Sequence, residues 1–336
     1  TGYFEKKRWL YWDGTKEMEK KKRYSDYNTY LRQLFGQRVQ KISIDAGLSC
    51  PNRDGSLSDK GCIYCNLKGS GSGMFAKGFS IKDQIEQGKI GAMKKYKAKK
   101  FLAYFQSYTN TYTTCDYMKQ MFDTVFSCEG VVGMAIGTRP DCIDEQKLDL
   151  IASYAKKYLV WLEYGLQSAH DATLKIINRG HRVNDFFTAL NVTSGRGINI
   201  CAHVILGLPG ENRNMMLQTA KILADSPING VKIHLLYVIK ETFLDRMWKT
   251  GNYVPMGQEE YVNMVCDFLE LLPKRIIIQR ITGDPHVDEL RAPLWAAQYR
   301  ETFNMIQTTL ETRDSFQGKM YEKKDNGSEN SPAPTV

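Results

Sequence analysis

The sequence lacks any apolar run of about 18 residues, so no segment of its 336 residues is expected to cross a membrane. The N-terminal stretch, from Thr1 onward, is charged and lacks the apolar core of a signal peptide. The eight cysteines are irregularly spaced, which is typical of a reducing compartment rather than of a disulfide-rich secreted domain. We therefore expect a cytoplasmic protein without a membrane partner.

A second pair of closely spaced cysteines is also missing. Cys62 and Cys65 form a single C-x2-C pair, and Cys50 precedes them in the pattern C-x11-C-x2-C. A structural zinc site usually takes its ligands from two such pairs. Three thiolates from one loop suit a [4Fe–4S] cluster better, because they leave one iron free to bind a small molecule such as S-adenosylmethionine. Buried thiols or half of a zinc site are the alternative.

Acidic residues are scarce in two segments of a chain whose net charge is +9. Residues 1–36 carry nine Lys or Arg against five Asp or Glu, and residues 77–100 carry eight Lys against two acids. Aromatic residues are interleaved in both segments, as on surfaces that bind nucleic acids. Solvated lysine faces of ordinary helices are the alternative interpretation.

Short apolar stretches alternate with longer amphipathic ones along most of the chain. We predict strands at residues 41–46, 100–106, 131–137, 159–166, 199–206 and 231–236. We predict helices near residues 80–96, 114–127, 144–156, 170–192, 212–225 and 257–271. Six strand–helix repeats predict an α/β fold in which helices cover a parallel sheet.

The repeats occupy residues 37–275 and follow a basic leader, residues 1–36. An apolar run and a helix candidate near residues 293–312 come next, so we expect residues 276–312 to form a C-terminal extension packed on the repeats. Residues 313–336 are rich in Lys, Asp, Ser, Asn, Gly and Pro. This composition predicts a disordered tail.

Polar residues and glycines follow the predicted strands, at the carboxyl ends where parallel α/β folds gather reactive groups. The cysteine loop follows the first strand. The later strands are followed or ended by Gln106, Ser107 and Asn110, by Arg139 and Asp141, by Glu163 and Gln167, by His203, by Gly207 to Gly210, and by His234. Together they predict a site at one edge of the sheet.

Some of these residues also have purely structural interpretations. Arg139 and Asp141 fit a salt bridge with a helix cap. Glu163 lies inside an apolar strand, where a carboxylate must find a hydrogen-bond donor. Gly207-x-x-Gly210 is either a simple turn or a place where backbone closely approaches a ligand.

Six segments together resemble the radical S-adenosylmethionine family of YhcC and YtqA proteins, relatives of the radical domain in the elongator catalytic subunit. They are the cysteine loop, Tyr104 to Thr109, Gly137 to Asp141, Glu163 to Gln167, Ile177 to His181, and Gly207 to Glu211. The resemblance runs collinearly from about residue 24 to residue 312. It implies a partial (β/α)6 TIM-type barrel that binds one [4Fe–4S] cluster and S-adenosylmethionine.

The resemblance also implies roles for individual residues. Cys50, Cys62 and Cys65 take the positions of the cluster ligands. Gln106 and Ser107 lie where the family contacts the methionine amino group of S-adenosylmethionine.

Other positions correspond to the nucleoside part of that cofactor. Glu163 and Gln167 lie where the ribose is held. The segment from Leu206 to Gly210, beginning with Leu206 and Gly207, and the backbone near Leu236 lie where the family flanks the adenine.

Three further residues are expected near the cofactor or the substrate. Arg139 follows the third strand, and Arg179 and His181 lie where elongator-like enzymes place polar groups. The resemblance names no catalytic residue. No acetyltransferase domain follows the repeats in this sequence, so we do not expect the acetyl-transfer reaction of the elongator.

Proteins of the YtqA branch resemble enzymes that act on the wobble uridine of tRNA and convert a carboxymethylaminomethyl group at C5 towards aminomethyl. The resemblance therefore implies tRNA as the partner, together with an electron donor such as flavodoxin or ferredoxin. The basic segments fit a tRNA substrate, whose binding is salt-sensitive. Two alternatives stay open: a radical enzyme acting on a small molecule, and a non-catalytic, zinc-stabilised RNA-binding protein.

Overall fold

The structure, a computed structural model, describes residues 22–321 apart from residues 67, 68, 70 and 72. Its main sheet contains seven parallel strands in the order β1-β2-β3-β4-β5-β6-β8. The strands are β1 (Val39–Ile44), β2 (Lys100–Phe105), β3 (Val131–Thr138), β4 (Leu159–Gln167), β5 (Asn199–Leu206), β6 (Gly230–Leu235) and β8 (Ile277–Arg280). The six predicted strands and their parallel arrangement are confirmed.

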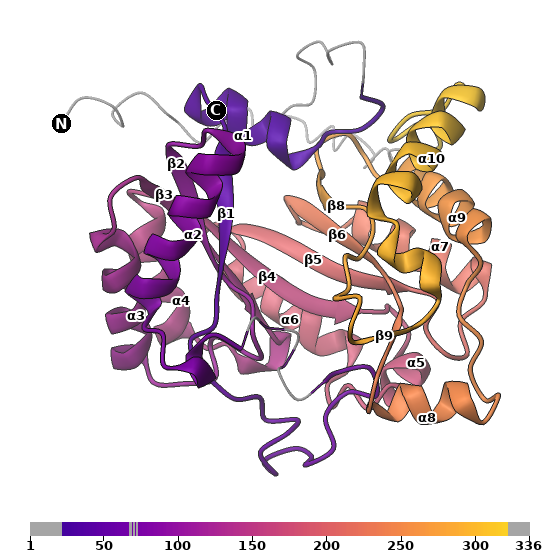
Figure 1. The fold of residues 1–336 in the computed structure, drawn as a ribbon, viewed down its shortest axis with the longest axis horizontal. Helices are drawn as coiled ribbons and strands as arrows, with labels where there is room; N and C mark the ends of the chain where they lie inside the picture. Colours follow the sequence, from indigo (N-terminus) through magenta and orange to yellow (C-terminus); the bar gives the residue numbers. More distant parts are fainter. Residues whose placement is uncertain (1–21, 67–68, 70, 72, 322–336) are drawn as a thin grey trace, which may run out of the picture.

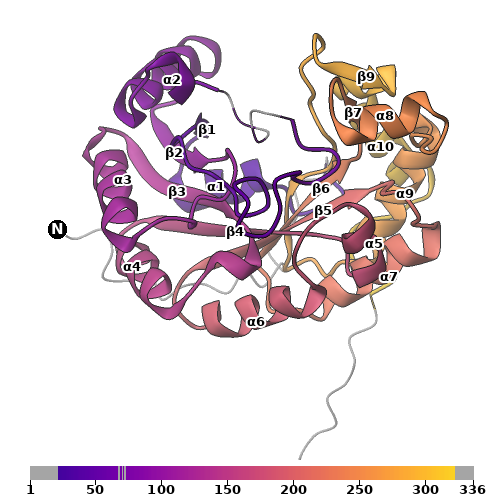
Figure 2. The same cartoon turned by 90° about the horizontal axis from the view of Figure 1, so that it is seen from below.

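Helices cover the outer face of this sheet, and the sheet curls so that its other face forms the inside of a partial barrel (Figure 1 and Figure 2). The helices between the strands are α2 (Ile81–Tyr96), α3 (Cys115–Ser127), α4 (Glu145–Ala155), α5 (Asp171–Ile176), α6 (Val183–Thr193), α7 (Arg213–Ala224), α8 (Phe243–Lys249) and α9 (Gln258–Leu271). Strands β1 and β8 stand at opposite ends of the strand order and are not paired. The predicted partial barrel is therefore confirmed, with an open side between these strands.

Strand β8 is one strand more than the six predicted repeats supply. The sequence analysis placed the residues after 275 outside the sheet, but β8 pairs with β6 in parallel. Ile277 belongs to the inner apolar cluster and Ile278 to the outer one. A short run of branched apolar residues buried on both faces is typical of a strand in a parallel sheet that is covered on both sides, even where it is the last strand. The run therefore joins the barrel and is not part of a separate extension.

The segment after β8 packs against the barrel, as expected for this region. Strand β7 (Val238–Ile239) pairs in antiparallel fashion with β9 (Leu290–Ala292). Helix α10 (Tyr299–Thr312) lies against α9. The helix predicted near residues 293–312 thus begins later, because Pro293 precedes a 3-10 turn, Leu294–Ala297.

The predicted helix 170–192 is wrong, because two helices occupy this stretch. Helices α5 and α6 are separated by a loop in which Asn178 and Gly180 both have positive φ. A left-handed backbone cannot continue a right-handed helix. The interruption places Arg179 and His181 in a loop at the carboxyl end of the strands, and not on a helix face.

The amino ends of the strands are closed by apolar packing. Helix α1 (Tyr27–Phe35) places Tyr27 against the indole of Trp161, with ring centroids 5.5 Å apart in a T-shaped arrangement. Trp161 is fully buried and lies among Leu102, Leu159 and Ile277. This apolar layer closes the amino end of the barrel around Trp161, and the loop that follows β1 lies at the other end of the strands.

The disordered tail predicted at residues 313–336 is wrong for its first part. Gln317 is fully buried, and its side-chain amide donates to the carbonyls of Pro273 and Ile276, both at 2.8 Å. Its Oε1 accepts a hydrogen bond from the backbone N–H of Ser25 at 2.9 Å. One buried amide with several backbone partners fixes this polar segment in place. The rest of the tail, residues 322–336, and most of the basic leader, residues 1–21, lie outside the described residues.

None of the helices in the part of the chain that the structure describes is long and apolar enough to span a membrane.

Candidate active site

The cysteine loop lies at the carboxyl end of the sheet, directly after β1 (Figure 2). Cys50 and Cys62 are buried and Cys65 is partly buried. Backbone hydrogen bonds fold the loop back on itself, including Gly61 N–H to Asn52 O at 2.7 Å and Cys65 N–H to Cys62 O at 3.0 Å. Burial, reinforced by the neighbouring Cys62 and Cys50 thiols, raises the pKa of Cys65 to about 11. The structure thus places the three predicted ligands on one folded loop, with Cys62 and Cys50 near enough to Cys65 to affect its pKa.

Three N–H groups lie close to these sulfur atoms. Asn52 Nδ2 is 3.6 Å from Cys62 Sγ, Arg179 Nη1 is 3.7 Å from the same atom, and Arg53 Nη1 is 3.3 Å from Cys65 Sγ. Hydrogen bonds of this kind stabilise negatively charged sulfur ligands. Asn52 and Arg53 were not predicted as site residues from the sequence. Their position inside the Cys50–Cys62 loop could have indicated a role beside the sulfur atoms.

Arg179 also joins the cysteine loop to the end of β4. Its guanidinium donates to the carbonyl of Gly165, with Nη2 to O at 2.9 Å, and it is buried. His181 reaches the same carbonyl through Nε2 at 3.1 Å. A Cβ atom on Gly165 would lie 2.5 Å from both Arg179 Nη2 and Gln167 Nε2, so a larger residue there would displace the ends of these two side chains. Gln167, Arg179 and His181 are therefore neighbours, as the predicted site requires, while their roles stay predictions.

The salt-bridge interpretation of Arg139 and Asp141 is confirmed. Arg139 Nη2 lies 2.7 Å from Asp141 Oδ2, and Arg139 Nη1 donates to the carbonyl of Arg179 at 2.7 Å. Burial by itself would raise the pKa of Asp141, but the hydrogen bonds and charge of Arg139 hold it below the usual value. The helix-cap interpretation is wrong, because Asp144 caps α4 by accepting from Lys147 N–H. The buried Arg139 thus supports the Arg179 loop.

Unpaired polar atoms lie in the segment that follows β2. The hydroxyls of Ser107 and Thr109 and the carbonyl oxygen of Asn110 are buried without a hydrogen-bond partner in the described structure. The segment is held against the cysteine loop by a hydrogen bond from Thr109 N–H to Ser49 O at 3.2 Å. Buried polar atoms normally have partners, so this segment has unused capacity for a polar ligand. Gln106 begins it, directly after β2.

The predicted adenine contacts lie in a largely apolar region. Leu206 and Leu236 are buried, and Leu236 N–H donates to Leu206 O at 2.9 Å. Leu236 packs in a cluster that includes Ile63, which lies between two of the cysteines. Gly207 has a φ of +84°, and a Cβ atom there would lie 2.9 Å from Met256. The left-handed backbone and the nearby Met256 explain on structural grounds why glycine occupies position 207. Its contact with adenine stays a prediction.

Glu163 lies deeper in the barrel and is fully buried. Its Oε2 accepts from Lys232 Nζ and from His203 Nε2, the latter at 2.9 Å, and its Oε1 lies 3.4 Å from Lys41 Nζ. The expectation that this carboxylate must find donors is confirmed. Both of its oxygens are engaged, and its predicted ribose contact is not visible in these hydrogen bonds. Lys41 and Lys232 were not predicted as partners of Glu163 from the sequence. A lysine inside the buried strand β6 could have indicated an interior ion pair.

Aromatic faces surround the same cations. Lys232 Nζ lies 4.1 Å and Lys41 Nζ 4.5 Å from the centre of the Tyr104 ring. Burial lowers the pKa of Lys232 to about 7, and the charges of Lys41 and Arg280 act in the same direction. The negative charge of Glu163 acts in the opposite direction and raises it. Burial and the charge of Lys232 lower the pKa of His203 to about 4. The interior therefore disfavours additional positive charge.

Acidification is expected to destabilise the protein through His203. The unfolded side chain binds a proton near pH 6.5, whereas the folded one stays neutral down to about pH 4. The stabilisation is present above the unfolded pKa and is lost as the pH falls, by about 1.4 kcal/mol per pH unit. Urea denaturation at several pH values should show this slope, and His203→Gln should reduce it by about that amount. An unchanged slope in the variant would contradict the prediction.

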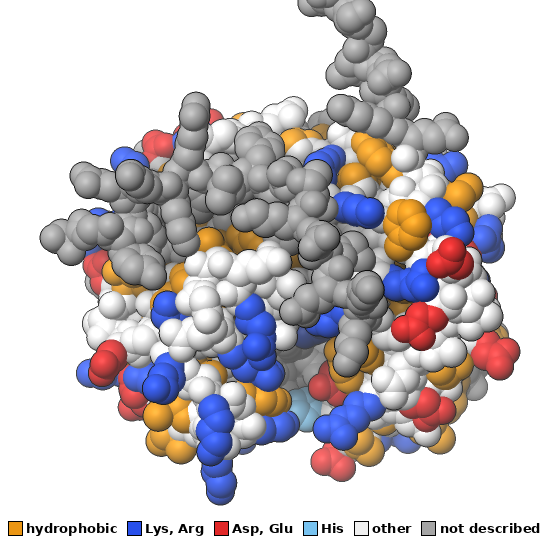
Figure 3. Space-filling model, turned by 90° about the horizontal axis from the view of Figure 1, so that it is seen from above, with side chains coloured by type: hydrophobic (Ala, Val, Ile, Leu, Met, Phe, Trp, Pro, Cys, Tyr) orange, Lys and Arg blue, Asp and Glu red, His pale blue; other side chains and the backbone are white. Residues whose placement is uncertain are grey.

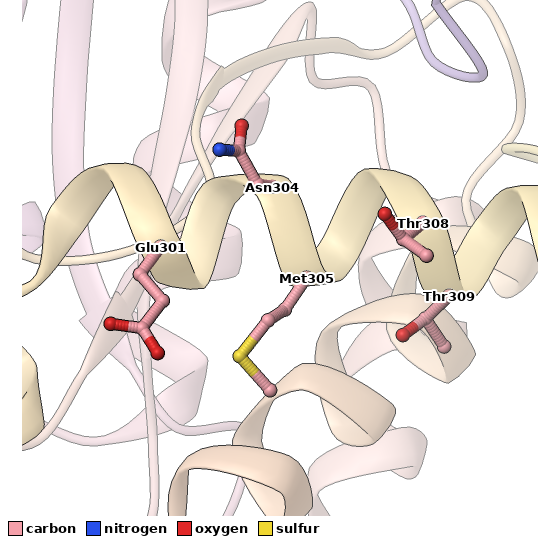
Figure 4. A pocket seen from close by; sticks show the side chains of 5 residues that line it. All are labelled: Glu301, Asn304, Met305, Thr308 and Thr309. Atoms are coloured by element: carbon pink, nitrogen blue, oxygen red, sulfur yellow. The ribbon is translucent and has the colours of Figure 1, made fainter.

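A shallow depression of about 610 Å³ lies on the surface of α10 (Figure 4). Its described lining residues are Glu301, Asn304, Met305, Thr308 and Thr309, all from this helix. Their side chains project from different sides of one helix and do not converge on a point (Figure 4). The depression therefore has no arrangement of groups for catalysis, and the cysteine loop stays the candidate site.

The sequence matches the Radical SAM superfamily over residues 58–223 and the Radical_SAM C-terminal domain over residues 228–312. It is similar to the uncharacterized protein YtqA of Bacillus subtilis, with 38% identity over 302 residues, 90% of this chain and 94% of YtqA. The chain belongs to the radical SAM superfamily, in the branch of YtqA and YhcC. It is 36% identical over 266 residues to YhcC of Escherichia coli, covering 79% of this chain and 85% of that protein.

More distant relatives match part of the chain. A tRNA uridine(34) acetyltransferase of Dehalococcoides mccartyi is 28% identical over 156 residues, 46% of this chain and 33% of that protein. The solved structure of Methanocaldococcus infernus Elp3 gives a TM-score of 0.61 at 19% identity, covering 83% of this chain and 64% of that one. The barrel fold and the predicted relationship to the elongator radical domain are confirmed.

Radical SAM enzymes use a [4Fe–4S] cluster and S-adenosylmethionine, and the residues of this chain fit both. The three cysteines on one loop, with N–H groups close to Cys62 and Cys65, suit a sulfur-ligated cluster. No three His, Cys, Asp or Glu side chains in the described ranges converge on a single metal ion. The unpaired hydroxyls of Ser107 and Thr109 beside the loop suit a polar ligand. The family therefore supports the [4Fe–4S] cluster rather than half of a zinc site, while the assignment of Cys50, Cys62 and Cys65 as its ligands stays a prediction.

Proposed function

We propose that this radical SAM enzyme acts on the wobble uridine of tRNA and converts a carboxymethylaminomethyl group at C5 to aminomethyl. The observation that carries the proposal is a basic edge at the open side of the barrel. When bound, the cluster and S-adenosylmethionine supply a 5′-deoxyadenosyl radical that removes a hydrogen atom from the substrate. We assign to flavodoxin or ferredoxin the delivery of the electron.

The basic edge is formed by lysines of α2 and of the turn after it. Exposed lysines occur at positions 82, 94, 95, 97 and 99. Helix α2 precedes β2 and packs against β1, the strand that borders the open side. Lys and Arg side chains border a hollow in which a histidine ring is visible (Figure 3). A phosphate backbone bound along this edge would place a flipped base at the opening.

The relatives support a nucleic-acid substrate in a second way. A protein named for its action on uridine 34 of tRNA aligns with nearly half of this chain. This alignment does not imply that the two proteins catalyse the same reaction. The proposed conversion of the C5 side chain rests on the resemblance to the YtqA branch. The residues that hold the cofactor, by this proposal, are Gln106, Ser107, Arg139, Glu163, Gln167, Arg179, Leu206, Gly207 and Leu236.

The test uses anaerobically reconstituted protein with S-adenosylmethionine and a strong reductant. We expect 5′-deoxyadenosine formation to depend on tRNA taken from cells that lack this gene, and mass spectrometry of the digested tRNA to show the loss of the carboxymethyl group. Cleavage that is indifferent to tRNA would contradict the proposal and favour a small-molecule substrate instead.

The basic edge can be tested with a charge-reversal variant. Changing Lys94, Lys95 and Lys97 to Glu is expected to weaken tRNA binding by at least about tenfold and to reduce its dependence on salt. The matched control changes Lys156 and Lys157, two exposed lysines after α4, to Glu. Equal losses in both variants, measured by fluorescence anisotropy at several salt concentrations, would show that the edge has no special role.

A further inference from the structure

The interior of the barrel contains more positive than negative charge. Lys41, Lys232 and Arg280 face one another across the inner surface, and Glu163 is the one carboxylate within ion-pair distance of any of them in the described ranges. Lys232 is 2% exposed and Glu163 is fully buried. Glu163 therefore contacts both lysines, and Arg280 has no carboxylate within ion-pair distance in the described ranges.

Arg280 is the cation of this group that has no carboxylate. It lies on β8 directly opposite Lys232 of β6, although the strand register shifts by one residue at this point. Its Nη1 is 3.5 Å from Nε2 of His234. The part of the chain that the structure describes offers it no acidic partner within ion-pair distance. A partly buried guanidinium without a counter-ion is costly for a folded protein unless a ligand supplies the missing charge.

Histidines extend this cationic group towards the cofactor end of the barrel. His203 pairs with Lys232 in register, and His234 is two residues further along β6. The two imidazole rings lie 5.8 Å apart. Burial, followed by the charge of Arg280, holds the pKa of His234 well below its usual value, so its ring is neutral. Neutral imidazoles can donate an N–H to an anion without adding charge.

The adjacent residue supplies an independent observation. Gln279, next to Arg280, has both atoms of its side-chain amide buried without a hydrogen-bond partner in the described structure. The amide nitrogen lies near the Trp161 ring. A Cβ atom built on Gly230 would be 3.3 Å from Gln279 Nε2 and 2.9 Å from Trp161 Cζ3. Buried amides of this kind normally bind protein groups or a ligand. The Gln279 amide is therefore free to bind a polar group next to the guanidinium of Arg280.

We infer that the interior of the barrel contains a carboxylate-binding subsite, with Arg280 as its main ligand and His234 and Lys232 beside it. A planar guanidinium matches the two oxygens of a carboxylate, and Arg280 lies on β8, at the opposite end of the strand order from β1, against which the basic edge packs. The inference rests on the proposed function in one respect: for that substrate, the bound group is the carboxylate of the carboxymethylaminomethyl side chain. Binding it would hold the neighbouring carbon at the cofactor end of the barrel.

The subsite is tested first by binding to the cluster-loaded protein. The probes are anticodon stem-loops that carry either 5-carboxymethylaminomethyluridine or 5-aminomethyluridine, followed by fluorescence anisotropy. We expect the protein to prefer the carboxylated stem-loop by at least about tenfold. Arg280→Met should abolish the preference without changing affinity for the other stem-loop, Arg280→Lys should keep part of it, and the exposed control Arg300→Met should keep all of it. A preference that survives in Arg280→Met overturns the inference.

A second measurement does not depend on tRNA. We would follow the imidazole NMR signals of His203 and His234 during titration with millimolar N-methylglycine, dimethylamine or methyl phosphate. Saturable shifts with N-methylglycine alone, absent in Arg280→Met, support the subsite even if no stem-loop binds, in which case only the tRNA proposal fails. No shift with N-methylglycine, or a shift with methyl phosphate instead, overturns the carboxylate assignment.

Discussion

Replacing Cys62 by alanine is expected to reduce 5′-deoxyadenosine formation to the background of the assay. The chain supplies three thiols from one loop, and a four-iron cluster that leaves one iron open for S-adenosylmethionine needs all three. Cys62 is also the sulfur towards which both Asn52 and Arg179 direct an N–H group. Its loss removes a predicted ligand and one hydrogen-bond acceptor of each side chain, although Asn52 still donates to Asn178 O and Arg179 to Gly165 O. Iron content, visible absorption and 5′-deoxyadenosine yield measure the effect.

The matched control is Cys115→Ala. Cys115 is the first residue of α3, is partly exposed, and lies outside the cysteine loop. We expect this variant to retain the iron content and the cleavage rate of the unmodified protein. Cleavage that persists in Cys62→Ala at the same iron content would contradict the assignment of this cysteine as a cluster ligand.

Replacing Glu163 by glutamine is expected to lower the free energy of unfolding by about 3–5 kcal/mol. The carboxylate is fully buried and is the one acidic partner of Lys41 and Lys232 among the described residues. Glutamine keeps the size of the side chain, but it removes the attraction that raises the pKa of Lys232, so Lys232 must lose its proton to stay buried, and Lys41 loses its counter-charge. Urea denaturation of the reconstituted protein at neutral pH measures the loss.

A double variant distinguishes lost charge balance from lost shape. Adding Lys232→Met to Glu163→Gln removes the cation together with its partner, so stability should recover in part. The exposed ion pair of Glu145 with Arg196 gives the control, and Glu145→Gln should cost less than about 1 kcal/mol. Equal costs for the buried and the exposed variants would contradict the prediction.

The local pattern of residues along the chain was sufficient to predict the strands and to find the cysteine loop. The strands of this sheet are short apolar runs buried on both faces, and this signal appears in the order of the residues themselves. The cysteine spacing is likewise a property of one contiguous loop. The same reasoning failed for residues 170–192, because a helical pattern does not reveal that Asn178 and Gly180 adopt a left-handed backbone. It failed for Gln317 because composition does not show which backbone carbonyls a distant amide will meet.

By itself, the sequence determined the α/β class, the order of the first six strands and the family, and it predicted Cys50, Cys62 and Cys65 as the cluster ligands. Each depends on residues that are adjacent or regularly spaced along the chain. Only the tertiary structure decided that β8 completes the sheet and that Glu163 meets Lys41 and Lys232, residues more than sixty positions away. Curling the sheet brings separate strands to face one interior, where burial strengthens every charge interaction. The charge balance of that interior is set by which strands face each other, and no local pattern contains this information.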